Sequence, residues 1–180
     1  MNLKEINNLI QNRKFLERRL KKFEKMRLIR EEKINFSEIE GHLQKSESNL
    51  KFVKDNLKLN YLDWCVTGCY YALYHTTLAL ILQKGFLSKN HNATICLLIK
   101  YYFPEIEREE LRLINKLFID YQDLLFYTQL KNKRKLFTYS TENHLNSQEV
   151  DKLRLDSIKL INKMKEILEN GKNKDKRSYN

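Results

Sequence analysis

Residues 64–83 read WCVTGCYYALYHTTLALILQ, a run of twenty residues without a charged side chain. A helix of about 20 apolar residues is long enough to span a bilayer. This stretch also carries polar side chains, among them Thr67, Tyr70 and His75, which is unusual for a helix that faces lipid. A central helix of a soluble bundle, buried on nearly all sides, explains the pattern better, so we expect no membrane partner.

The composition of the chain around this stretch favours an all-α fold. The chain has 180 residues with one Pro and four Gly, whereas sandwiches and barrels need many turns rich in these residues. Hydrophobic residues make up 42% of the chain, enough for a core. The cysteines number three, an odd count, and Met1 to Lys4 shows no signal peptide. These features predict a cytoplasmic protein with free thiols.

Apolar periodicity predicts one long helix over residues 2–33, with an apolar stripe formed by Leu3, Ile6, Leu9, Leu16, Leu20 and Phe23. The formal charge of the chain is +11, and residues 13–33 hold ten Lys/Arg and four Glu, a net +6. A basic balance suggests a polyanionic partner, and this helix would then be an arm that lies along phosphates. An ordinary solvated helix face explains the charge as well, and we favour it.

The remaining helices are marked by caps and breakers. Ser37 with Glu40 is a capping box, which predicts a helix from there to about Asn60. Gly85 is the expected C-cap of the central helix over residues 61–84. Further expectations are a loop at 86–90, a short helix capped by Ser88 or Asn90, a helix from Pro104 to about Phe137, and a last helix from Ser147 to Gly171. The predicted organisation is an N-terminal arm (1–35), a helical bundle (36–170) and a disordered basic tail (171–180).

Several landmarks occur in a fixed order along the bundle. Residues 70–75 read YYALYH, Gly85 follows ten residues after His75, and residues 89–91 read KNH. Arg134 is then followed, after three residues, by Thr138 and Tyr139. In this order the landmarks resemble the HEPN family, whose fold is an up-down bundle of four to five helices. The resemblance covers about three-quarters of the chain.

The resemblance also implies a ribonuclease activity, but this sequence lacks the motif on which that activity depends. Active HEPN ribonucleases carry an Arg, four to six residues and then a His, which hold the scissile phosphate and move a proton. None of the four histidines here has an Arg at that spacing, and residues 137–139 are Phe, Thr and Tyr. We therefore expect the ribonuclease motif to be degenerate and the protein not to be an enzyme. The alternative is a divergent metal-independent endoribonuclease that uses Arg134 with Tyr139 or a displaced His144.

A basic stretch survives where the motif would lie. The predicted anion site consists of Lys131, Lys133, Arg134, Lys135, Lys89 and His91, with Arg134 and Tyr139 as the candidate catalytic pair. In relatives paired with a small nucleotidyltransferase, a Tyr near this Arg is modified with AMP, so Tyr139 is the candidate for modification by resemblance. The other interpretation is a helix C-terminus, where Lys and Arg are favoured in any case.

Other polar groups on the central helix have simpler explanations. Cys65 and Cys69 share a face, and His75 or Cys96 would complete a zinc site, but burial as small hydrophobic residues is favoured. We expect no metal and no cofactor. The tyrosines of the YYALYH run would stack bases or pack in the core or at a dimer interface. His75 is expected to be a core histidine, whereas His91 is left open.

The sequence supports three hypotheses about function. The leading hypothesis is a dimeric HEPN-like module that binds RNA or a nucleotide in a defence or toxin–antitoxin system, with a nucleotidyltransferase as a partner by resemblance. The second is the endoribonuclease toxin described above. The third is a structural protein that oligomerises or docks a partner through residues 2–59.

Overall fold

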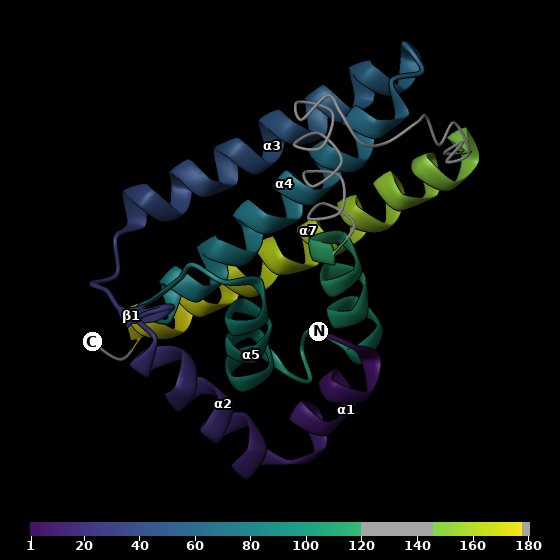
Figure 1. Cartoon of the computed structure of the whole chain (residues 1–180). Helices are drawn as coiled ribbons and strands as arrows, with labels where there is room; N and C mark the ends of the chain where they lie inside the picture. Colours follow the sequence, from purple (N-terminus) through teal and green to yellow (C-terminus); the bar gives the residue numbers. More distant parts are fainter. Residues whose placement is uncertain (120–145, 178–180) are drawn as a thin grey trace, which may run out of the picture.

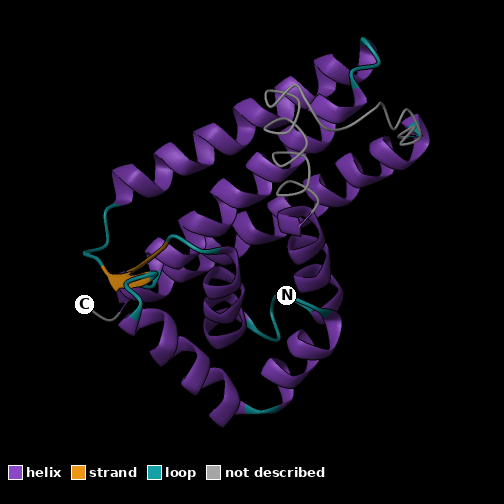
Figure 2. Cartoon of the chain, viewed as in Figure 1, coloured by secondary structure: helices purple, strands orange, loops and turns teal. Residues whose placement is uncertain are grey.

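The computed structural model describes residues 1–119 and 146–177 of the chain, and the described part is almost entirely helical (Figure 2). Three long helices lie side by side in Figure 1: α3 (Phe36–Lys58), α4 (Leu62–Gln83) and α7 (Ser147–Arg177), with α4 in contact with both others. The prediction of an all-α bundle is confirmed.

Helix α4 contains the uncharged run of residues 64–83 and forms the centre of the core. By length and composition it is the one helix in the described part that would cross a membrane, yet 78% of its most apolar window is buried within the fold. Burial against α3 and α7 explains why residues 64–83 carry no charge and are apolar on nearly all sides, whereas Asp63 lies in the exposed first turn.

Small residues let α3 and α4 approach closely. A Cβ atom at Gly68 would overlap Cγ2 of Val53, so only glycine fits at this crossing. Further along the pair, the buried Thr76 hydroxyl donates to Ser46 Oγ at 2.8 Å. The polar break in the apolar seam of α3 is therefore satisfied by a hydroxyl of α4.

The prediction of one helix over residues 2–33 is wrong. The structure has α1 (Leu3–Gln11), then α2 (Arg13–Lys25), separated by Asn12 in an extended conformation. The Asn12 side chain accepts a hydrogen bond from the Phe15 amide at 3.0 Å, which caps α2 and explains the break. Both helices still bury the predicted apolar stripe except for Leu3, which is exposed, and they pack on α5 (His91–Tyr102).

The predicted loop at 86–90 is also wrong in part, because it contains a strand. β1 (Ile29–Glu31) pairs with β2 (Phe86–Ser88) in antiparallel register, with Ile29 opposite Ser88. Gly85 adopts φ +75° directly before β2, and its carbonyl accepts from Glu32 N at 2.9 Å. The left-handed conformation that ends α4 thus also sets up the strand pair.

Asparagine side chains also cap α3, α5 and α7. Asn35, rather than Ser37, caps α3 by accepting from the Ser37 and Glu38 amides. Asn90 caps α5 as one of the two predicted candidates. Asn146, rather than Ser147, caps α7, and its side chain accepts from the Gln148 amide at 2.9 Å. These corrections move a boundary by one or two residues and leave the order of helices unchanged.

Two further boundaries differ from the prediction. The helix expected to open at Pro104 begins at residue 108, after a turn that places Pro104 on the surface, and its extension past residue 119 lies outside the described residues. Helix α7 does not end at Gly171 but continues to Arg177. A Cβ at Gly171 would lie 2.8 Å from Nε2 of Gln83, so this glycine serves close packing against α4 instead of ending a helix.

Candidate functional site

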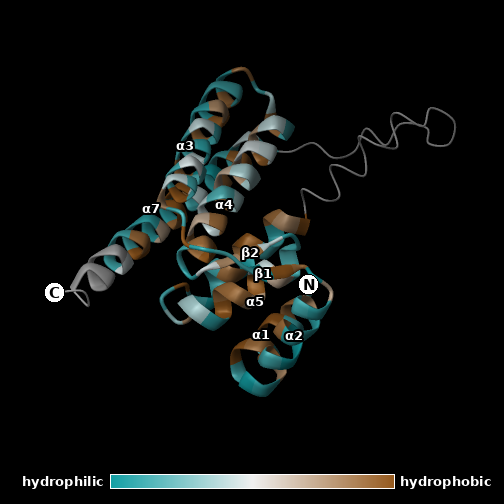
Figure 3. Ribbon diagram, turned by 90° about the vertical axis from the view of Figure 1, so that its left-hand side faces the viewer, coloured by the Kyte–Doolittle hydropathy of each residue, from teal (hydrophilic) through white to brown (hydrophobic). Residues whose placement is uncertain are grey.

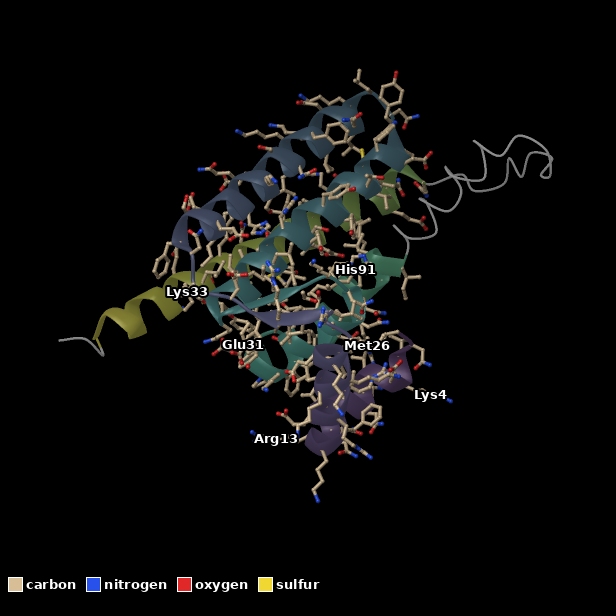
Figure 4. All side chains as sticks on the ribbon, turned by 60° about the vertical axis from the view of Figure 1, so that its left-hand side comes forward. Lys4, Arg13, Met26, Glu31, Lys33 and His91 are labelled. Atoms are coloured by element: carbon tan, nitrogen blue, oxygen red, sulfur yellow. The ribbon has the colours of Figure 1, made fainter. Side chains whose placement is uncertain are left out.

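Six aromatic and imidazole rings gather where α4, α5 and the helix at 108–119 meet. We call this group the aromatic–histidine cluster; its members are Tyr70, Tyr71, Tyr74, His75, His91 and Phe118. Four of them come from the YYALYH run, whose one- and four-residue spacings place them on neighbouring rows of α4. His91, the first residue of α5, contributes a further ring and is labelled in Figure 4.

His91 is held by contacts on both its edge and its face. Its Nε2 lies 3.3 Å from the Tyr70 hydroxyl, and its ring stacks on Phe118 with centroids 4.3 Å apart. Tyr74 approaches edge-on at 5.5 Å. Burial lowers the pKa of His91, so the imidazole is neutral near pH 7. In that form one ring nitrogen donates a hydrogen bond, the other accepts one, and the ring carries no positive charge.

His75 has a partner that the sequence analysis did not single out. Its Nδ1 lies 3.0 Å from Nδ1 of His42, which comes from α3. Burial, then the neighbouring His42 and Lys45, lowers the pKa of His75 to about 4. Burial likewise lowers the pKa of His42, against the opposing charge of Glu38. One ring must donate and the other accept, so the pair is stable only when at least one is neutral.

Of the predicted anion site, only Lys89 and His91 can be located. Lys89 is exposed, and its amide donates to Leu28 O at 2.9 Å beside the strand pair. His91 points into the aromatic–histidine cluster instead, so no hydrogen bond or ion pair joins these two side chains in the described part. The other members lie outside the described residues, as does His144: Lys131, Lys133, Arg134, Lys135 and Tyr139.

The cysteines are core residues, as predicted. Cys65, Cys69 and Cys96 are free and fully buried. Burial raises the pKa of Cys69 and of Cys96 to about 12, so both thiols stay protonated and unreactive near neutral pH. Within residues 1–119 and 146–171, no three metal-ligating side chains come together.

A family model described as the HEPN domain matches residues 39–174, well over half of the chain. The match begins in α3 and ends in α7, so it includes the aromatic–histidine cluster and leaves α1, α2 and β1 outside. No curated protein matches the chain.

Proposed function

Because the chain belongs to the HEPN family, we propose that it is a dimeric module that binds RNA or a nucleotide and does not cleave it. The family is generally linked to RNA-related or toxin roles. Family membership is the observation that carries the proposal, and the chemistry of the aromatic–histidine cluster supports it.

The cluster offers groups suited to a base or ribose. Tyr74 and His91 are half-buried, and each carries an aromatic ring with a hydrogen-bonding atom. Aromatic faces stack on bases of any identity, and neutral imidazoles hydrogen-bond to base edges or hydroxyls. Burial raises the pKa of Tyr74, so its phenol remains a donor at neutral pH. The cluster supports recognition of an uncharged part of a nucleotide.

The proposal assigns the phosphate to the basic stretch that includes Lys131 and Arg134. The missing Arg-to-His spacing argues against cleavage there, since neither Phe137 nor Thr138 can carry a proton in the reaction. By family resemblance, the same proposal includes Tyr139 as a site of AMP modification, a nucleotidyltransferase partner and a cytoplasmic defence or toxin–antitoxin setting.

Fluorescence anisotropy with labelled single-stranded RNA at low and high salt tests the binding. We expect binding that weakens as salt rises, because phosphate contacts release counterions. His91→Phe keeps the ring stack on Phe118 but removes both ring nitrogens, and should weaken binding by roughly 2- to 10-fold, the effect of one hydrogen bond. Tyr61→Phe, which removes an exposed hydroxyl outside the cluster, is the matched control and should bind as the unmodified protein does.

Two outcomes would overturn the proposal. Absence of binding at low salt removes the RNA function altogether. Cleavage of the RNA by the unmodified chain, lost in Arg134→Ala, would instead establish the endoribonuclease alternative. Sedimentation of the full chain checks the proposed dimer, and a monomer at binding concentrations contradicts that part.

A further inference from the structure

Helix α2 carries an outer face of cations that make no ion pairs. Six exposed side chains on it have no carboxylate within ion-pair distance in the described part of the chain: Arg13, Lys14, Arg18, Lys21, Lys22 and Lys25. The nearby carboxylates do not neutralise this face: Glu5 pairs with Arg19, Glu17 lies 3.5 Å from Lys100, and the exposed Glu24 offsets one of the six charges. The face therefore presents a dense positive potential to solvent.

The opposite side of α2 is fixed in the fold. Leu16, Leu20 and Phe23 are buried, and the helix packs on α5 (Figure 3). An amphipathic helix binds a bilayer by inserting its apolar face, and here that face is already covered. The cations instead form a rigid row, about 18 Å long from Arg13 to Lys25 at 1.5 Å per residue. Figure 4 shows Arg13 at the outer end of this helix, away from His91.

Two adjoining hollows give this face a shape. One, of about 780 Å³, is lined by α2 itself from Arg13 to Lys21. The second, of about 230 Å³, shares Arg13 and Glu17 with the first and reaches Lys100 and Phe103 at the end of α5. Phe103 is 37% exposed. A row of cations that leads to an exposed aromatic ring is the arrangement by which proteins hold single-stranded nucleic acid.

We propose that the outer face of α2, together with the hollow at Phe103, binds the backbone of single-stranded RNA, with a base stacked on the Phe103 ring. This inference rests on the proposed RNA-binding function and deepens it by naming the surface. The surface lies in residues 13–25 and at the end of α5, so most of it precedes the HEPN match, and it shares no residue with the aromatic–histidine cluster.

A charge-neutralised variant tests the surface against a matched control. The test variant is Arg13→Gln, Arg18→Gln and Lys21→Gln in the full chain. The control removes the same charge with Lys51→Gln, Lys54→Gln and Lys159→Gln, exposed lysines without ion pairs on α3 and α7. Figures 1 and 3 place α3 on the opposite side of the molecule from α2. Thermal unfolding followed by circular dichroism confirms that both variants are folded.

Affinity for a labelled single-stranded oligouridylate is measured over a salt series. Each lost phosphate contact lowers the slope of log affinity against log salt by about 0.7, so three losses lower it by about 2 and weaken binding about 100-fold at 0.1 M salt. The control should change the affinity less than tenfold. Phe103→Ala should weaken binding at least fivefold with an unchanged slope, because stacking is not electrostatic.

The possible outcomes distinguish a failure of the α2 surface from a failure of the proposed RNA-binding function. If the unmodified chain binds the RNA but the test and control variants lose affinity equally, the α2 surface is wrong and the proposed function stands. If the unmodified chain does not bind at low salt, the proposed function fails. Equal binding of polyglutamate or of anionic vesicles, lost in the same test variant, would assign the surface to an acidic protein or a membrane and overturn the RNA inference.

Discussion

The imidazoles of His42 and His75 make the folded state sensitive to acid. The pKa of His75 is about 4 in the fold and about 6.5 in an unfolded chain, so between these pH values the unfolded state binds more protons. The free energy of unfolding should therefore fall as pH drops from about 6.5 towards 4. The lowered pKa of His42 acts in the same direction. Urea unfolding at several pH values measures the slope.

A single substitution isolates this contribution from other titrating groups. His75→Gln keeps a hydrogen-bonding side chain opposite His42 but cannot be protonated. The variant should show a flatter dependence of unfolding free energy on pH between 6.5 and 5, where most carboxylates stay ionised. Identical slopes in the two proteins would contradict the role of His75, while a parallel vertical shift would reflect packing alone.

At the scale of the helices, α3 and α4 each contain one glycine, and an added methyl group should have opposite effects on stability at the two positions. Gly68→Ala should lower the free energy of unfolding by about 1–3 kcal/mol, because its Cβ meets the buried and rigid Val53 side chain. Gly41 has no atom within 4 Å of an added Cβ, so Gly41→Ala should raise it by up to about 1 kcal/mol through helix propensity. Urea unfolding of the two variants measures both effects. A Gly68→Ala protein as stable as the unmodified one would refute the close crossing, and a destabilised Gly41→Ala would refute the open space at Gly41.

Sequence patterns predicted the elements whose signals are local. The uncharged run over residues 64–83, the left-handed Gly85 and the cap at Asn90 each act through neighbouring atoms, and the structure has α4 and α5 where they indicate. The break at Asn12 was missed because the apolar stripe continues on both sides of it, and periodicity alone does not separate two helices from one.

Features that depend on distant contacts were not predictable in the same way. Strand β1 has three residues and forms only because β2 lies beside it, some 57 positions later, where Ile29 meets Ser88. Gly171 was assigned as a helix end because glycine commonly ends helices, whereas its role depends on Gln83 of another helix. His42 belongs to the candidate site region only through the pairing of α3 with α4, which brings it to His75.

At the scale of the molecule, the N-terminal helices cover part of the core. Five of their side chains are buried against the rest of the fold: Ile6, Leu9, Leu16, Leu20 and Phe23. Asn115 Nδ2 donates to Met1 O at 3.0 Å, which holds the start of the chain to the helix at 108–119. Residues 1–34 are therefore expected to stabilise the region that matches the HEPN family, in addition to any part they take in binding.

Deleting residues 1–34 should lower the thermal midpoint by ten degrees or more and increase binding of a hydrophobic dye, since each buried aliphatic side chain contributes on the order of 1.5–3 kcal/mol. The charge-neutralised α2 variant is the control, because it keeps the apolar contacts and should unfold near the unmodified midpoint. A truncated protein with unchanged midpoint and altered mass in solution would instead favour the role of this segment in oligomerisation.

The short strand pair connects the end of α2 to the start of α5 through backbone hydrogen bonds. β1 follows α2 after three residues, and β2 ends two residues before Asn90, which starts α5 at His91. Three pairs of ladder residues therefore join the segment that follows the helix with the unpaired cations to the segment that precedes the neutral imidazole of His91. If a ligand on the outer helix changed the affinity of the ring cluster for a second ligand, thermodynamic linkage would require the reverse effect to have the same factor.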